Sequence, residues 1–304
     1  MFTVRQLRYF QVLAKKGHFG EASEKLGISQ PALSVQIAEM EKTAGAPLFE
    51  RSSKRILLTP LGKNFQPLID DILLRLAALV DVASNYDGPL SHPLKLGIIP
   101  TIAPYLLPLL LPQTHRLYPK LNLVIQEAKT DNLLEMLRVG HVDAIIAALP
   151  IECDELISEP LFKDQFYLAV AKDEFVHFNK TIDQADLDNH KLLLLEEGHC
   201  LREQTLQACQ TKEYRHDITA SSLTTLLQLV ENGIGITIIP QIAVSTEMRQ
   251  ENLKLIPFCM PVPYREVHLV WRRRSQRLED FKLFAQMVKS LADSILREAK
   301  NFIT

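Results

Sequence analysis

The chain has 304 residues, of which 47% are hydrophobic and 23% are charged. This composition is typical of a soluble globular protein with two or three compact units, and it excludes a disordered chain, a collagen-like fibre and a small disulfide scaffold. The longest uncharged stretch, residues 96–114, contains four prolines, so we expect no membrane span. The N-terminus lacks the pattern of a secretory signal, and we therefore expect a cytoplasmic protein with reduced cysteines.

The formal net charge of −2 is unevenly distributed along the chain. Residues 1–60 hold nine Lys or Arg and five acidic side chains, a net charge of +4, which leaves −6 for the remainder. A compact basic unit on an acidic body suits a polyanion-binding head, because phosphate contacts depend on local positive charge. On charge alone, a chance imbalance of surface residues explains the difference equally well.

The periodicity of apolar residues predicts three helices near the N-terminus. Residues 4–16 and 19–26 form two amphipathic segments, each followed by a glycine that can end a helix. Ser29 provides an N-cap for a third helix that runs to about Thr43, with Pro31 in its first turn. Two short helices around a glycine-containing turn make a helix-turn-helix motif.

One face of the third helix carries small and amide side chains, which suit close approach to base edges in a major groove. These residues are Gln30, Pro31, Ser34 and Val35. An exposed polar helix face is the alternative, and taken alone it is the better explanation. Residues 47–60 then form a strand, a basic turn and a second strand, which predicts a wing whose Arg51 contacts phosphate.

The apolar positions of residues 60–84 alternate in steps of four and three, which is the pattern of a heptad seam about three heptads long. The seam consists of Phe65, Ile69, Ile72, Leu76 and Leu79. Such a helix pairs with a second copy or packs within its own chain. Residues 1–90 contain no other helix of matching length, which favours pairing.

After a turn-rich linker at residues 86–89, short apolar strands alternate with helical segments. The expected strands are residues 94–99, 121–127, 144–149, 166–171, 191–195, 236–239 and 267–271, and a final helix begins near Leu278. This alternation predicts parallel sheets with helices on both faces, divided between two lobes. The cleft between such lobes is the default position of a small-molecule site. A nucleotide site is not expected, because the sequence has no Walker motif and no complete G-x-G-x-x-G motif.

Cys200 differs from Cys153 and Cys259, whose surroundings suggest inert packing thiols. It follows an apolar strand and lies at the start of an expected helix, where unpaired amides, with Arg202 and a protonated His199 close by, would stabilise the thiolate that attacks peroxides. Cys209, nine residues further on, is placed to resolve the resulting sulfenic acid. The pair is not C-x-x-C and has no second ligand pair, so we expect no metal site.

The N-terminal residues resemble the LysR-type transcriptional regulators over the whole winged helix-turn-helix. The resemblance rests on residues 22–26, 29–34, 36–37, 41, 48–51 and 58–62. It implies an α+β protein with an N-terminal winged helix-turn-helix at residues 1–60, a long linker and dimerisation helix at 61–88, and a two-lobed α/β effector domain, similar to periplasmic binding proteins, at 89–304. Lobe I would comprise residues 89–164 and 267–304, and lobe II residues 165–266.

The segment around Cys200 resembles the peroxide-sensing members of this family, which share its Gly-His-Cys-Leu-Arg-acid-Gln sequence and a second cysteine nine positions later. The resemblance implies that Cys200 is the peroxidatic thiol, that Cys209 resolves it as a disulfide, and that oxidation activates oxidative-stress genes. It also implies that the peroxide is surrounded by Thr101, Thr130, His199 and Arg272. The expected partners are double-stranded promoter DNA, hydrogen peroxide, RNA polymerase and further copies of the chain in a homotetramer, with no cofactor.

Two other functions stay open at this point. The cleft could bind a small metabolite reversibly while the cysteines remain silent, which thiol titration before and after peroxide would reveal. Alternatively, the body could be a thiol peroxidase or hydrolase that uses Cys200 with His199. We expect no enzyme, because adjacent residues of a helix rarely face each other and a basic winged head does not serve catalysis.

Overall fold

The computed structural model describes residues 1–51, 55–84, 88–148, 153–208, 218–248 and 252–303 of the chain. These residues form two compact units, Met1–Ala83 and Ser84–Thr304. Among the described helices, none is both long enough and apolar enough to cross a membrane.

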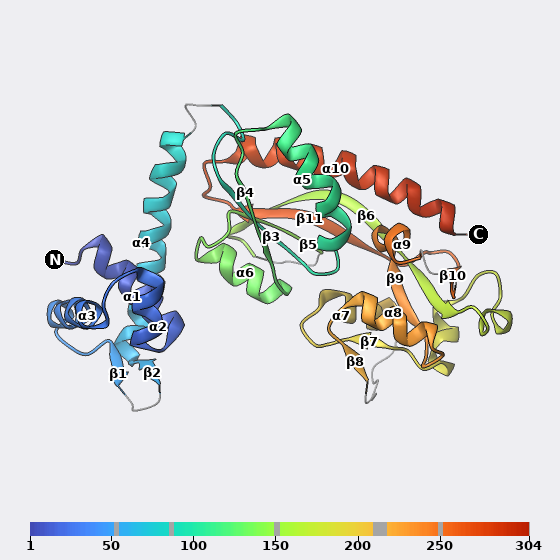
Figure 1. Cartoon of the computed structure of the whole chain (residues 1–304), viewed down its shortest axis with the longest axis horizontal. Helices are drawn as coiled ribbons and strands as arrows, with labels where there is room; N and C mark the ends of the chain where they lie inside the picture. Colours follow the sequence, from blue (N-terminus) through green and yellow to red (C-terminus); the bar gives the residue numbers. More distant parts are fainter. Residues whose placement is uncertain (52–54, 85–87, 149–152, 209–217, 249–251, 304) are drawn as a thin grey trace. The chain divides into compact units, whose positions relative to one another are not determined.

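The first unit is a winged helix-turn-helix followed by a long helix (Figure 1). Its elements are α1 (Val4–Lys16), α2 (Phe19–Leu26), α3 (Gln30–Ala44), β1 (Phe49–Arg51), β2 (Ile56–Leu58) and α4 (Pro60–Ser84), with β1 and β2 antiparallel. Gly17 and Gly27 adopt the left-handed conformation that ends α1 and α2, and the Ser29 hydroxyl accepts a hydrogen bond from the amide of Ala32. The three helices predicted from periodicity and capping are therefore confirmed.

One apolar core joins the helices to the wing. Phe10, Leu33 and Ile37 are fully buried in it. The ring centroids of Phe10 and Phe49 lie 5.0 Å apart, which attaches β1 to α1. Burial of these residues leaves the opposite face of α3 free to contact another molecule.

Helix α4 divides its apolar residues between this core and the surface. Ile69 is 2% exposed, and the ring of Phe65 lies 5.7 Å from that of Phe2. Ile72 and Leu79 are exposed. The prediction that Phe65 and Ile69 belong to a seam open to a partner is wrong, because the first turns of α4 pack on the core of their own unit.

The second unit is built on a seven-stranded mixed sheet in the order β10-β6-β11-β5-β3-β4, with β9 paired to β6. The strands are β3 (Leu94–Ile98), β4 (Leu123–Glu127), β5 (Ala144–Ala148), β6 (Leu156–Ala171), β9 (Thr237–Pro240), β10 (Leu253–Pro257) and β11 (Tyr264–Arg272). Strand β3 is parallel to β4 and β5, whereas β6 and β11 are antiparallel to all their neighbours. The expectation of parallel sheets holds within this sheet only for β3, β4 and β5, because β6 and β11 run antiparallel to each other and to their other neighbours.

Helices pack on both ends of this sheet (Figure 1). They are α5 (Ala103–Leu117), α6 (Thr130–Arg138), α7 (Cys200–Ala208), α8 (Leu223–Glu231), α9 (Gln241–Glu247) and α10 (Leu278–Ala299), with 3-10 turns η2 (Phe175–His177), η3 (Gln184–Asn189) and η4 (Lys300–Phe302) and the short parallel strands β7 (Leu194–Leu195) and β8 (Thr219–Ala220). We call β3–β5 with α5, α6 and α10 lobe I, and β7–β10 with α7–α9 lobe II. Strands β6 and β11 connect the two lobes.

Replacing Ile69 by alanine should destabilise the first unit by about 2–5 kcal/mol, because the change leaves a cavity in its core. Leu57 of β2 is 55% exposed and provides the matched control. Leu57→Ala should change stability by less than about 0.5 kcal/mol. Hydrogen exchange of the α1 amides in the full chain measures both effects, and equal acceleration in the two variants would contradict the packing described above.

Candidate functional site

Cys200 is the first residue of α7 and borders a narrow pocket between the two lobes, which we call the Cys200 pocket. The pocket is nearly closed, with almost no room for a water-sized molecule. Its lining consists of Ile99, Pro100, Thr101, Lys129, Thr130, Gly198, His199 and Cys200. Lobe I supplies the first five of these residues and lobe II the last three.

The lobe I side of the Cys200 pocket follows from strand topology. Strands β3 and β4 are parallel neighbours, so their carboxyl ends meet at one edge of the sheet. Thr101 comes soon after β3, and Thr130 is the first residue of α6, which follows β4. The two predicted threonines therefore lie at the same edge, facing the start of α7.

The hydroxyl groups of Thr101 and Thr130 differ in their hydrogen bonding. Thr101 is 3% exposed, and its Oγ1 accepts a hydrogen bond of 2.8 Å from Arg265 Nη1. Oγ1 of Thr130 is buried and has no hydrogen-bond partner among the described groups. A buried hydroxyl without a partner is costly, so the Thr130 oxygen is available for a polar ligand in the pocket.

His199 is buried beside Cys200, with 4% of its surface exposed. Burial lowers the pKa of its imidazole below the ordinary value, the Lys129 ammonium lowers it further, and the Glu196 and Glu203 carboxylates act in the opposite direction. The direction of this shift disfavours the protonated His199 that the sequence suggested beside the helix amides and Arg202. A neutral imidazole still has one donor and one acceptor for a ligand.

Arg272 does not line the Cys200 pocket. Its guanidinium donates to the backbone carbonyls of Leu137 and Val142 in lobe I. Arg265 contacts a predicted pocket residue instead, since its Nη1 and Nη2 donate to the hydroxyl and the carbonyl oxygen of Thr101 at 2.8 and 3.1 Å. The lining of the pocket therefore does not include Arg272, whose guanidinium donates to carbonyls of lobe I.

Arg265 forms a fully buried ion pair that the sequence did not indicate. Its Nε lies 2.9 Å from Oδ2 of Asp164 in β6, and both side chains are completely inaccessible. Oδ1 of Asp164 accepts a 2.9 Å hydrogen bond from the amide of Ile242 in α9. Burial raises the pKa of Asp164, while the guanidinium and the backbone donors act to lower it.

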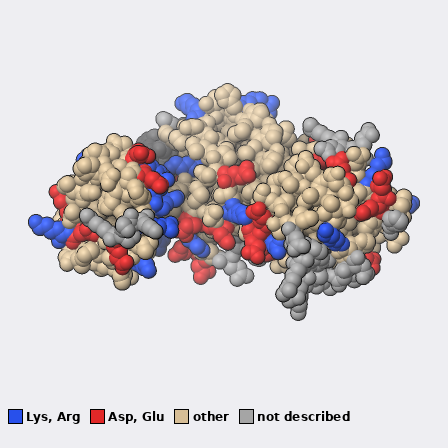
Figure 2. All heavy atoms as spheres, turned by 60° about the horizontal axis from the view of Figure 1, so that its bottom comes forward, with Lys and Arg blue, Asp and Glu red and all other residues tan. Residues whose placement is uncertain are grey.

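The predicted DNA-reading residues lie on the free side of α3. Gln30, Pro31 and Val35 are exposed and Ser34 is half-buried. Arg51 lies at the end of β1, and its side chain is outside the described residues. On the visible face of the second unit, Figure 2 shows acidic and basic side chains close together rather than one extended basic patch.

An apolar stripe remains exposed on α4. Leu68, Ile72 and Leu79 are 64%, 44% and 66% exposed, and Leu76 is half-buried. These residues lie on the side of α4 that does not pack on the core, at helical spacings of four and seven. The stripe therefore contains Ile72, Leu76 and Leu79 of the predicted seam, together with Leu68, which the prediction did not include.

Cys209, the second predicted redox cysteine, lies outside the described residues. Cys153, Cys200 and Cys259 are free thiols. Cys259 is exposed and lies 3.4 Å from the Thr181 hydroxyl, so its interpretation as a packing thiol is wrong. No three His, Cys, Asp or Glu side chains within the described ranges are arranged to hold a metal ion.

Two family models match the chain. Residues 4–63 match the bacterial regulatory helix-turn-helix protein of the lysR family, and residues 87–293 match the LysR substrate binding domain. The chain is 36% identical over 292 residues to the DNA-binding transcriptional dual regulator OxyR of Escherichia coli (strain K12), covering 95% of this chain and 96% of that protein. It is also 36% identical over 288 residues to a hydrogen peroxide-inducible genes activator of Dickeya chrysanthemi, covering 94% of each.

Solved structures of OxyR proteins are also similar to this chain over nearly its whole length. A full-length OxyR variant from Pseudomonas aeruginosa superposes with a TM-score of 0.77 at 36% identity, covering 95% of this chain and 98% of that one. A mutant of Corynebacterium glutamicum OxyR with H2O2 bound gives a TM-score of 0.68 at 35% identity, covering 98% of this chain and 97% of that one.

Removing the positive charge of the buried pair should be strongly destabilising. Arg265→Met leaves Asp164 buried without its partner, and we expect a loss of about 3–5 kcal/mol in the free energy of unfolding. The double variant Asp164→Asn with Arg265→Met removes both charges and should recover part of that loss. Urea unfolding of the full chain measures each variant; a double variant no more stable than Arg265→Met would show that the two charges are not coupled.

Proposed function

The chain belongs to the LysR family of DNA-binding transcription regulators, and we propose that within this family it is a cytoplasmic sensor of hydrogen peroxide. It is a regulator and not an enzyme, and its relatives named above include peroxide-inducible activators. The observation that carries the proposal is the Cys200 pocket, in which a thiol at the first residue of a helix faces the unpartnered hydroxyl of Thr130.

The narrowness and the charge of the pocket favour peroxide over a metabolite. The pocket has no room for a bulky ligand. The ammonium group of Lys129 is engaged by the Glu197 carbonyl at 2.7 Å and by the Glu196 carboxylate at 3.6 Å. Among the described lining residues, no unpaired cation is left to bind a carboxylate ligand, so a small uncharged ligand fits best.

In the first chemical step, the Cys200 thiolate attacks one peroxide oxygen. An S–O bond forms, the O–O bond breaks, and the second oxygen leaves as hydroxide, which takes a proton from solvent. Thr130 and neutral His199 hydrogen-bond the two oxygens, and Thr101 is held in place by Arg265. The backbone amides in the first turn of α7 stabilise the thiolate.

In the second step, the Cys209 thiolate attacks the sulfenic sulfur of Cys200. The S–S bond forms, the S–O bond breaks, and hydroxide leaves and takes a proton from solvent to become water. Helix α7 spans Cys200–Ala208, so Ala208 lies about 12 Å along the helix axis from Cys200. Cys209 follows Ala208 directly in the sequence.

A disulfide tolerates Cα separations only up to about 7 Å, so α7 must unwind before the bond closes. Leu201, Thr205 and Ala208 are buried in the reduced helix and would leave their packing. The cost of exposing them is comparable with the stabilisation a disulfide provides, about 2–4 kcal/mol. A segment balanced in this way can shift the arrangement of subunits in a homotetramer and thereby the spacing of the DNA-reading helices on promoter DNA.

In the proposed assembly, two copies of the chain pair through α4. Each copy then presents one set of DNA-contacting residues, which are Gln30, Pro31, Ser34, Val35 and Arg51. Dyad-symmetric promoter DNA and RNA polymerase are the partners that this arrangement requires for activation of oxidative-stress genes.

Three cysteine variants test the redox mechanism. Under peroxide, Cys200→Ser should form no disulfide and keep the DNA footprint of the reduced protein. Cys209→Ser should react and stop at a sulfenic acid or a mixed disulfide. Cys259→Ser, which changes an exposed thiol far along the chain, should behave like the wild type. Mass spectrometry and footprinting record the results, and a disulfide that joins Cys259 to Cys200 would contradict the mechanism.

A charge in the exposed α4 stripe tests the pairing of the heads. Leu79→Asp should lower the mass measured by light scattering and halve the footprint, because a buried unpaired carboxylate is costly in a helix seam. Val176→Asp in η2, where the side chain is 78% exposed, is the control and should leave both unchanged. An unaltered mass in Leu79→Asp would remove α4 from the interface.

A further inference from the structure

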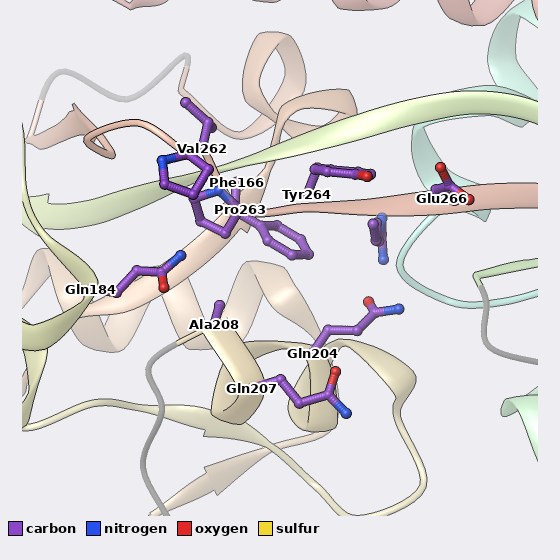
Figure 3. A pocket seen from close by; sticks show the side chains of 11 residues that line it. Phe166, Gln184, Gln204, Gln207, Ala208, Val262, Pro263, Tyr264 and Glu266 are labelled. Atoms are coloured by element: carbon purple, nitrogen blue, oxygen red, sulfur yellow. The ribbon is translucent and has the colours of Figure 1, made fainter.

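A second and larger cavity lies against the last turns of α7. It has a volume of about 540 Å³ and opens to solvent between α7 and the start of β11 (Figure 3). The side chains used below are Gln184, Gln204, Gln207, Phe166, Tyr264 and Glu266. We call this space the α7 cavity. Its volume falls within the range of sites that hold small molecules.

The two sides of the α7 cavity differ in chemistry. Gln204 and Gln207 of α7 and Gln184 of η3 place amide groups on one side (Figure 3). Each amide supplies both hydrogen-bond donors and an acceptor. Phe166 of β6 and Tyr264 of β11 lie on the opposite side, together with the proline-rich residues 261–263. The cavity therefore suits a molecule with a flat apolar face and a polar edge.

The charged groups that line the α7 cavity are already neutralised. Arg265 donates to Asp164 and to Thr101. Glu266 lies 3.6 Å from the ammonium of Lys163, which also sits 4.7 Å from the centroid of the Tyr264 ring. Among the described lining residues, an anionic ligand would find no unpaired cation, so the cavity favours an uncharged ligand.

We propose that the α7 cavity binds a small, uncharged, planar compound with a carboxamide or an equivalent donor–acceptor edge. Its ligand contacts Gln204 and Gln207 in α7 and residues of β11 at once, and so binds only while α7 is helical. By mass action such a ligand opposes the unwinding that the disulfide requires. This regulatory effect rests on the proposed redox function, whereas binding itself does not.

Binding is tested on the reduced full-length protein with nicotinamide as the probe, by saturation-transfer NMR titration. Gln207→Ala and Gln184→Ala should each weaken binding about fivefold, the loss expected for one hydrogen bond. Gln228→Ala, an exposed glutamine on α8 outside the cavity lining, is the matched control and should leave binding unchanged. Nicotinate, the anionic counterpart, should bind more weakly than nicotinamide.

Three results would overturn the assignment: no nicotinamide binding at millimolar concentration, equal binding of nicotinate, or equal weakening in Gln228→Ala. Regulation is tested separately by the rate of disulfide formation under peroxide. Saturating nicotinamide should slow this rate in the wild type and leave the Gln207→Ala rate unchanged. Binding without slowing would overturn the regulatory effect, and a wild type that binds nicotinamide but forms no disulfide would refute the redox function alone.

Discussion

The buried ion pair between Arg265 and Asp164 fixes the geometry on which the Cys200 pocket depends. It joins the two strands that cross between the lobes, and its remaining hydrogen bonds reach Thr101 in lobe I and the backbone of Ile242 in lobe II. Because both charges are removed from water, either one without its partner would be strongly unfavourable. The pair therefore holds Thr101 at one position relative to both crossing strands, and the lobe I side of the pocket is rigid.

The lobe II side of the same pocket is held much less firmly. Helix α7 has only nine residues, and the strand before it, β7, pairs through just two residues with β8. Short elements of this kind open at a lower free energy than a long central strand does. A redox switch needs a rigid part and a part that can change its fold. In the proposed mechanism, the lobe I side positions the oxidant, and α7 on the lobe II side carries the reacting thiol.

Sequence-based prediction succeeded for features set by residues close together in the chain and failed for features that depend on residues far apart in the chain. Left-handed glycines, the Ser29 N-cap and apolar periodicity are local signals, and they placed α1–α3 correctly. The long strand β6 was missed in its first half because Pro160, Lys163 and Asp164 interrupt its apolar pattern. Arg265 was missed for a related reason: its partner lies 101 residues away, and a charge within a buried strand is explained only by that partner.

Helix α7 contributes to both cavities, and this has a thermodynamic consequence. Cys200 at its first residue faces the narrow pocket, while Gln204 and Gln207, about one and two turns later, face the larger cavity. In the proposed mechanism, oxidation unwinds the helix and removes the binding surface for the proposed ligand of the α7 cavity. Thermodynamic linkage requires this coupling to be reciprocal. The ligand lowers the equilibrium constant for disulfide formation by the same factor by which the disulfide lowers the affinity for the ligand. One nine-residue helix can thus compare the peroxide level with the concentration of a second small molecule.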